Sequence, residues 1–185
     1  MNNIGKVKPD LEKIHLAYLL ANFRLELFPY EELSVNLYPD LRGVDDNAVS
    51  TLFELKSRTR PLEIEGRKRY PSDYEWWKLD PKQCKSYYDL SKVIGLDPYW
   101  IFMMADIPKK STLLEELSES IVLRREMWVA PWDSYEGVLP SPKGEYNFGL
   151  NRLLKRYSFN TFPGENSTLH IAKTITERVK HYFID

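Results

Sequence analysis

The run Tyr99–Ala105 places the strongest constraint on the fold, because it contains only apolar residues. Successive side chains of a strand point to opposite faces of its sheet, so this run predicts a strand that is buried on both faces. A strand of this kind needs other elements packed over each face. The chain is therefore expected to combine a sheet with helices in an α/β fold.

Three segments are expected to form helices. The first has apolar residues three and four apart, begins after a possible N-cap at Asp10 and ends at Pro29. The second begins at Asp80-Pro81, a typical N-cap and first helical residue, and ends at Gly95. The apolar stripe of the first helix comprises Leu11, Ile14, Tyr18, Ala21, Leu25 and Phe28. A final helix is expected over residues 167–183.

Extended runs around residues 33–41 and 49–56 flank Asp45-Asp46-Asn47, which is typical of a turn, and together they predict a β-hairpin. A polar, basic connection is expected from about residue 57 to 79. After the buried strand, the sequence predicts a short helix opening at Thr112, a strand over 121–132, a loop over 133–147 and a helix over 149–156.

Composition narrows the class of protein. The only cysteine, Cys84, excludes an internal disulfide and a cysteine-based zinc or iron–sulfur site within one chain. No apolar run approaches the roughly 20 residues that span a bilayer, and the first residues lack the apolar stretch of a signal peptide. We therefore expect a cytoplasmic protein without a membrane partner. No phosphate-binding loop, paired-His metal motif or serine-hydrolase elbow is present.

The expected hairpin brings charged residues together. A turn centred on Asp46 and Asn47 places Glu54 opposite position 39, beside Asp40, and strand alternation puts Glu54 and Lys56 on one face. Two carboxylates and an amine are costly to bury among apolar neighbours, unless they hold a metal ion and bind an anionic substrate. In a different register, Asp45 or Asp46 would be the metal ligand. A second acid-x-Lys, Asp80-Pro81-Lys82, is interpreted as a helix start.

Pro39-Asp40, then thirteen residues, then Glu54-Leu55-Lys56 resembles the signature of PD-(D/E)XK nucleases, which include restriction endonucleases. The resemblance covers about residues 10–105 and implies a restriction-endonuclease-like core, a mixed β-sheet flanked by helices. It leads us to expect one nuclease domain over residues 1–185, with a core over about 10–132 and a C-terminal extension over 133–185.

The resemblance also implies further site residues. Glu12 resembles the metal-site Glu that junction resolvases carry on their first helix. Gln83 and Tyr87 resemble the Gln-x-x-x-Tyr pattern of RecB-like nucleases, and they lie one helical turn apart. Asp40, Glu54, Glu12 and the carbonyl of Leu55 would bind Mg²⁺, for which Mn²⁺ is a possible substitute. Asp40, Glu54, Lys56 and Gln83 would form the catalytic set.

The expected activity is Mg²⁺-dependent hydrolysis of DNA, most simply by a homodimeric type II restriction endonuclease. One alternative is a phage- or repair-type nuclease, either an exonuclease or a Holliday junction resolvase. Another is a non-catalytic module that binds DNA or a partner protein. The net charge of −1 leaves DNA binding open, since the local charge matters. Candidate DNA contacts in the basic connection are Arg58, Arg60, Arg67, Lys68 and Arg69.

Overall fold

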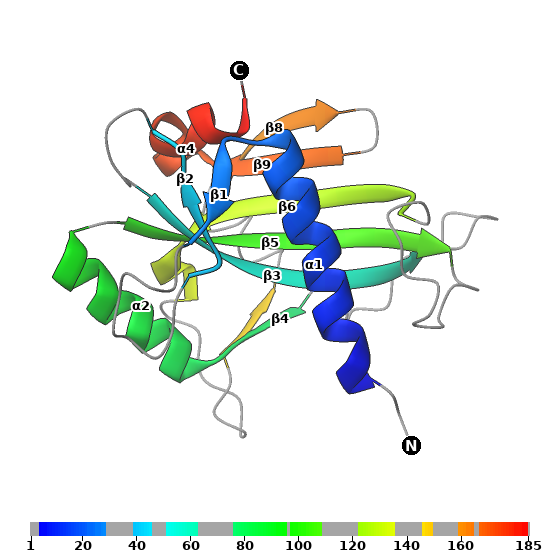
Figure 1. Cartoon of the computed structure of the whole chain (residues 1–185), viewed down its shortest axis with the longest axis horizontal. Coiled ribbons are helices and arrows are strands. Elements are labelled where there is room, and N and C mark those ends of the chain that lie inside the picture. The colour runs from blue at the N-terminus through cyan, green and yellow to red at the C-terminus, as the bar shows by residue number, and fades with distance from the viewer. Residues whose placement is uncertain are drawn as a thin grey trace.

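The computed structural model describes residues 4–28, 39–45, 51–62, 76–95, 97–108, 122–135, 146–149, 159–164 and 167–184. Its main element is a 7-stranded sheet with the strand order β1-β2-β3-β5-β6-β9-β8, beside a 2-stranded sheet of β4 and β7 (Figure 1). The strands are β1 Leu25–Leu27, β2 Leu41–Gly43, β3 Thr51–Leu62, β4 Trp76–Leu79, β5 Asp97–Pro108, β6 Arg124–Pro131, β7 Tyr146–Gly149, β8 Phe159–Gly164 and β9 Ser167–Ala172.

The large sheet is mixed. β3 pairs with β5 and β6 with β9 in parallel, while the remaining neighbours in this sheet pair antiparallel. Helices α1 (Ile4–Asn22) and α4 (Thr176–Phe183) cover one face, where Leu19 and Val179 join the same buried cluster as Phe53. Helix α2 (Pro81–Ile94) covers the other face, where Tyr87 packs on Trp100. The expected α/β fold, a mixed sheet flanked by helices, is confirmed.

Two predicted elements are found where the sequence places them. In β5, every residue from Tyr99 to Ile107 is at most 6% exposed, so the strand is buried on both faces. In α2, the side chain of Asp80 accepts a hydrogen bond from the Lys82 N–H at 2.8 Å. Gly95 ends this helix with a φ of 66°, a left-handed conformation that glycine adopts without strain.

The first predicted helix is wrong at both ends. Helix α1 includes Asp10, which is therefore not its N-cap, and it ends at Asn22. Leu25 lies in β1, opposite Gly43, and the Phe28 N–H donates to the carbonyl of Asp40 at 3.1 Å. The apolar spacing continues past the helix end because Leu25 and Phe28 are buried as extended residues in the same core.

The final helix is also shorter than predicted, because 167–172 forms β9 and α4 begins at Thr176 after a short 3-10 turn, η6 (Lys173–Ile175). Leu169 and Ile171 are buried with the period of a strand, whereas Val179, Tyr182 and Phe183 follow the period of a helix. β9 pairs with β6, so residues that the sequence assigns to an extension belong to the large sheet.

The expected connection over 57–79 is wrong at its two ends, since 57–62 continues β3 and 76–79 forms β4. The strand expected over 121–132 is found as β6, and residues 132–135 form a 3-10 turn, η5 (Trp132–Tyr135). Gly149 ends β7 instead of starting a helix. The predictions for 33–38, 112–115 and 150–156 lie outside the described residues. None of the helices in the described ranges has the length and apolar character needed to cross a membrane.

Candidate functional site

The β2–β3 hairpin carries the predicted acidic residues. Leu41 pairs with Phe53 and Arg42 with Leu52 in an antiparallel register. Continued by one residue, this register sets Asp40 opposite Glu54, one position from the alignment expected from the sequence. A hairpin is therefore confirmed, but its first strand is Leu41–Gly43 instead of the run expected around 33–41, and its register brings Asp40 and Glu54 closer together than expected.

The carboxyl groups of Asp40 and Glu54 lie close together. The Leu55 N–H donates to Oδ2 of Asp40 at 2.8 Å, and the Glu54 carboxyl is near enough for its charge to act on Asp40. Burial, followed by the charge of Glu54, raises the pKa of Asp40 to about 8. Two acids this close in a buried position favour sharing a proton, and a bound cation would relieve the same repulsion.

Lys56 points to the same spot from the next position on that face of β3. Its Nζ donates to Oε1 of Glu54 at 2.9 Å and to Oε1 of Gln83 at 2.7 Å. The same Nζ lies 5.6 Å from the ring centroid of Trp100. Trp100 is buried on β5, where it lies opposite Glu54 in the pairing of β3 with β5. The ammonium is thus held between a carboxylate, an amide and an aromatic ring.

Helix α2 supplies two more donors to Glu54. Gln83 donates from Nε2 to Oε1 of Glu54, and the Tyr87 hydroxyl donates to Oε2 of the same carboxylate. Gln83 and Tyr87 lie one turn apart, 3.3 Å between Nε2 and the hydroxyl oxygen. Burial, and then the nearby charge of Glu54, raise the pKa of Tyr87, so its hydroxyl keeps its proton and acts as a donor.

Glu12 approaches this group from α1. Its charge is one of the causes that raise the pKa of Asp40, although a smaller one than burial or Glu54. Within the described residues, no three His, Cys, Asp or Glu side chains form a group that could hold a metal ion. The acidic part of the site therefore consists of the Asp40–Glu54 pair, with Glu12 farther away.

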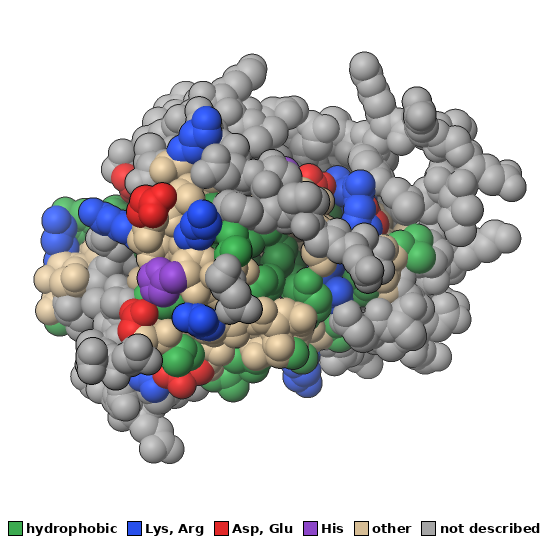
Figure 2. All heavy atoms as spheres, turned by 90° about the horizontal axis from the view of Figure 1, so that it is seen from above, with side chains coloured by type: hydrophobic (Ala, Val, Ile, Leu, Met, Phe, Trp, Pro, Cys, Tyr) green, Lys and Arg blue, Asp and Glu red, His purple; other side chains and the backbone are tan. Residues whose placement is uncertain are grey.

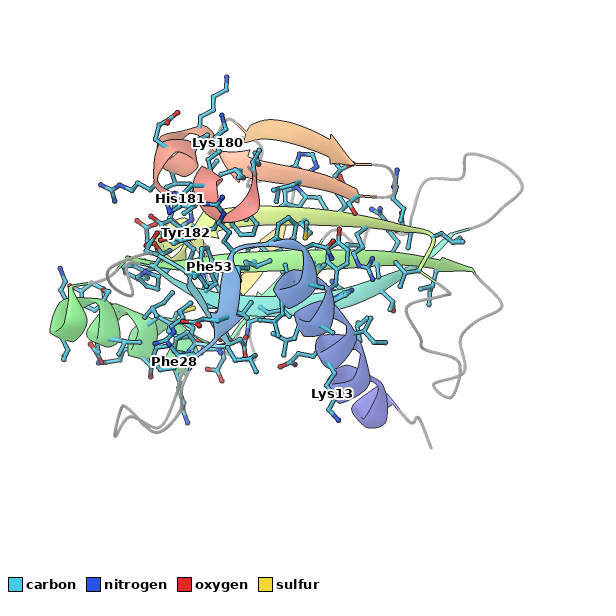
Figure 3. The ribbon with its side chains drawn as sticks, turned by 45° about the horizontal axis from the view of Figure 1, so that its top comes forward. Lys13, Phe28, Phe53, Lys180, His181 and Tyr182 are labelled. Carbon is cyan, nitrogen blue, oxygen red and sulfur yellow. The ribbon has the colours of Figure 1, made fainter. Side chains whose placement is uncertain are left out.

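Asp45, the alternative metal ligand, lies elsewhere. Its Oδ2 accepts from the Tyr182 hydroxyl at 2.6 Å, and its Oδ1 lies 3.1 Å from Nε2 of His181. Tyr182 belongs to α4, on the far side of the sheet from α2, where its ring points toward Phe53 (Figure 3). Asp45 thus helps to fix α4 to the hairpin, and Asp46 lies outside the described residues.

The candidate DNA contacts separate into three groups. Arg58 is partly buried, with its guanidinium 5.8 Å from the ring centroid of Trp77. Arg60 is only 8% exposed and donates to Asp106 from two nitrogens, so its expected place in an exposed loop is wrong. Residues 67–69 lie outside the described residues. On the face shown in Figure 2, Lys and Arg side chains are interspersed with Asp and Glu.

Trp100 lines the site but is not among the sequence-predicted residues. Trp100 contacts Lys56 and packs edge-on against Tyr87, with ring centroids 5.4 Å apart. Its Nε1 donates to the carbonyl of Trp132 at 2.7 Å. An apolar run does not reveal such contacts, because they depend on the parallel register between β3 and β5.

Comparisons with known proteins give limited information. No family model and no curated protein sequence matches the chain. Among solved structures, the chain is similar to Hjc, a Holliday junction resolvase from the archaeal hyperthermophile Archaeoglobus fulgidus. The match has 12% identity and a TM-score of 0.42, and covers 78% of this chain and 89% of that chain. Similarity at this level carries no argument about function, so the function is argued from the site itself.

Proposed function

We propose that the chain is a divalent-metal-dependent nuclease of the PD-(D/E)XK type that hydrolyses phosphodiester bonds in DNA. The observation that carries the proposal is the close Asp40–Glu54 pair, with Lys56 Nζ 2.9 Å from Glu54. Asp40 occupies the Pro-Asp position of that motif, and Glu54 and Lys56 occupy its Glu-x-Lys positions. A solvent-exposed ion pair on an edge strand does not explain it, because Glu54 is 7% exposed and β3 is an interior strand.

The donor set fits Mg²⁺, or Mn²⁺ in its place. Asp40 and Glu54 offer hard carboxylate oxygens, and a bound cation would offset the burial and the repulsion from Glu54 that raise the pKa of Asp40. These two residues would hold the ion together with the Leu55 carbonyl, while Glu12, which forms no three-residue group with them, would add its negative charge from farther away. When bound, the ion would acidify a water ligand and neutralise charge that develops on the phosphate.

The remaining residues orient the reacting groups. Lys56 holds the attacking water and contacts the scissile phosphate, while Gln83 fixes the ammonium through its Oε1 at 2.7 Å. Gln83 and Tyr87 both donate to Glu54, which holds its carboxylate in place and directs it at the site. Gln83 therefore acts beside Asp40, Glu54 and Lys56 in the catalytic set.

Within this class, we propose first a type II restriction endonuclease that works as a homodimer, with one site for each DNA strand. The second candidate is a phage- or repair-type nuclease, either an exonuclease or a Holliday junction resolvase. The contact of both Gln83 and Tyr87 with Glu54 favours this second candidate, since the Gln-x-x-x-Tyr pattern resembles RecB-like nucleases. A non-catalytic module would not need this complete set of acids and lysine.

Cleavage assays test the proposal. Supercoiled plasmid, linear plasmid and a four-way junction would be incubated with the protein in Mg²⁺ or in EDTA. Discrete fragments indicate a restriction enzyme, a smear indicates an exonuclease, and cutting confined to the junction indicates a resolvase. Lys56→Ala should abolish metal-dependent cleavage without unfolding the protein.

The matched control is Lys82→Ala. Lys82 belongs to the second acid-x-Lys of the chain and lies exposed in the first turn of α2. It should cut like the wild type. If Lys56→Ala retains full cleavage, or if the wild type cuts none of the three substrates, the proposed function is wrong.

A further inference from the structure

A second group of charged side chains crosses four strands of the large sheet. We call it the cross-strand ladder, and it consists of Arg60 on β3, Asp106 on β5, Arg124 and Glu126 on β6, and His170 on β9. Arg60 donates to Asp106 at 2.6 and 3.0 Å and to Glu126 at 3.3 Å. Nε2 of His170 lies 3.0 Å from Oε1 of Glu126.

The members of the ladder differ in exposure. Asp106 is 1% exposed, and the side chain of Arg60 is 10% exposed. The side chain of Arg124 is 50% exposed, and its Nε donates to Oδ2 of Asp106 at 2.9 Å. Arg60 already pairs with both oxygens of Asp106, so Arg124 is a second cation on a carboxylate whose charge is already balanced.

The geometry leaves the outer edge of Arg124 available. The hydrogen bond from Nε to the buried carboxylate of Asp106 fixes the orientation of the guanidinium plane. Among the described residues, its terminal nitrogens contact no carboxylate. A guanidinium fixed in this way presents two parallel N–H donors, the arrangement that binds a phosphate with little loss of side-chain freedom. Glu126 is directed away, toward His170 and Arg60, and these contacts lower its pKa although burial alone would raise it.

The ladder lies on the same sheet face as the proposed active site. Lys56, Arg58 and Arg60 occupy alternate positions of β3, and the strands β3, β5 and β6 are adjacent (Figure 1). Arg124 lies two strands across from Arg60, and Arg60 lies four residues along β3 from Lys56. These spacings place Arg124 on the order of 16 Å from Lys56. This corresponds to about five base pairs of duplex DNA.

We propose that the exposed edge of Arg124 binds a backbone phosphate of DNA about five base pairs from the bond that is cut. Asp106 and Arg60 are positioning residues for this contact. The inference rests on the proposed DNA substrate, and it adds a backbone-binding subsite to the site of cleavage. A phosphate contact of this kind sets the position of the duplex without reading its sequence.

DNA binding tests this inference separately from cleavage. The affinity of wild type and Arg124→Ala for labelled duplexes would be measured in Ca²⁺ and in EDTA over a range of salt concentrations. Arg124→Ala should weaken binding of a duplex of about 20 base pairs by about tenfold and reduce the salt slope by about one. A hairpin with about 4 base pairs spans about 14 Å, which is less than the distance between the two sites, so its binding should be affected much less.

Two variants serve as controls. Arg124→Lys keeps the charge without the planar fork, so it should recover part of the affinity. Arg178→Ala removes an exposed arginine from α4, which covers the opposite sheet face, and should bind like the wild type. Thermal unfolding of each variant reports whether the fold is intact.

The outcomes separate the two proposals. If Arg124→Ala binds the long duplex with wild-type affinity and salt slope, the subsite is wrong, while metal-dependent cleavage that needs Lys56 still supports the nuclease. If Arg124→Ala weakens binding but no substrate is cut, the subsite stands and the nuclease is wrong. If the wild type binds no DNA, the inference is wrong.

Discussion

The Leu55 N–H donates to Oδ2 of Asp40 at 2.8 Å, so the backbone of β3 fixes the first acid of the site beside the second. This contact ties Asp40 to the peptide bond that follows Glu54. Burial and the charge of Glu54 nevertheless raise the pKa of Asp40 to about 8, since one backbone hydrogen bond does not offset them. The metal-free site therefore keeps a proton at neutral pH.

This pKa predicts how the stability of the metal-free protein depends on pH. The unfolded carboxyl group loses its proton near its ordinary pKa of 3.8, whereas the folded one keeps it up to about 8. The folded state thus binds more protons over this interval, and the contribution of Asp40 to the free energy of unfolding falls as pH rises through it. Urea unfolding in EDTA at several pH values measures the slope.

Asp40→Asn should flatten this slope and raise the free energy of unfolding at pH 8 relative to the wild type. Asp89→Asn is the matched control, because Asp89 pairs with Lys85 on the exposed surface of α2 and should leave the slope unchanged. A slope in Asp40→Asn equal to that of the wild type would contradict the prediction.

The Tyr87 hydroxyl predicts an effect on catalysis. Tyr87→Phe removes the hydroxyl that donates a hydrogen bond to Oε2 of Glu54. The loss of this donor to a buried oxygen costs about 1–3 kcal/mol of stability. Under the proposed function, kcat should fall about tenfold or more, while the affinity for DNA changes little. Steady-state kinetics and a binding assay separate the two effects. Tyr88→Phe, on the exposed side of the same helix, is the control, and equal losses in both variants would argue against a specific role.

The sequence predicted the elements whose signals are local. Asp80 and Gly95 define the ends of α2 by capping chemistry, and the apolar run of β5 defines a buried strand. The turn signal predicted the hairpin, and strand alternation then placed Glu54 and Lys56 on one face. The grouping of Asp40, Glu54 and Lys56 was predictable because its members are close in sequence.

The parts that the sequence did not predict depend on distant pairing. Leu169 and Ala172 fit a helical stripe and Leu169 and Ile171 fit a strand, so only pairing with β6 decides between the two. Arg60 has the sequence context of a basic loop, but its partner Asp106 is 46 residues away on β5. Trp100 likewise contacts Lys56 only through the register of β3 and β5.

The Arg60–Asp106 pair predicts a large loss of stability on single substitution. Among the described residues, Arg60→Leu leaves the carboxylate of Asp106, which is 1% exposed, with the half-exposed Arg124 as its one remaining cation. We expect the free energy of unfolding to fall by about 3–5 kcal/mol. Lys85→Leu, which breaks an exposed pair, should change it by about 0.5 kcal/mol or less.

The double variant Arg60→Leu/Asp106→Leu tests the cause of that loss. Because it removes both buried charges, it should recover much of the stability lost in Arg60→Leu. Chemical denaturation of the four proteins gives the interaction energy. Additive losses would show that the two charges do not depend on each other.

The packing of Gly43 against Tyr182 predicts a steric effect. A Cβ at Gly43 would collide with the Tyr182 ring, whose Cδ1 would lie at 2.9 Å. The ring has little room to move, because its hydroxyl donates to Asp45 at 2.6 Å and lies 3.1 Å from Thr51 Oγ1. Gly43→Ala should therefore destabilise the protein by about 1–3 kcal/mol. The same substitution should cost much less in a Tyr182→Ala background, and an equal cost in both backgrounds would refute this explanation.

His15 predicts a loss of stability in acid. Its side chain is fully buried between α1 and the sheet, with Nδ1 2.9 Å from Ser57 Oγ, and Nε2 has no hydrogen-bond partner in the described part of the chain. Burial, followed by the positive charge of Arg125, lowers its pKa from 6.5 to about 3. Between these pH values the unfolded state binds a proton that the folded state does not bind. The contribution of His15 to the free energy of unfolding therefore falls as pH decreases from about 6.5 toward 3.

The free energy of unfolding of His15→Gln should depend less on pH in this range. His181→Gln, at an exposed position on α4, should behave like the wild type. Equal acid sensitivity of His15→Gln and wild type would mean that the buried imidazole does not determine it.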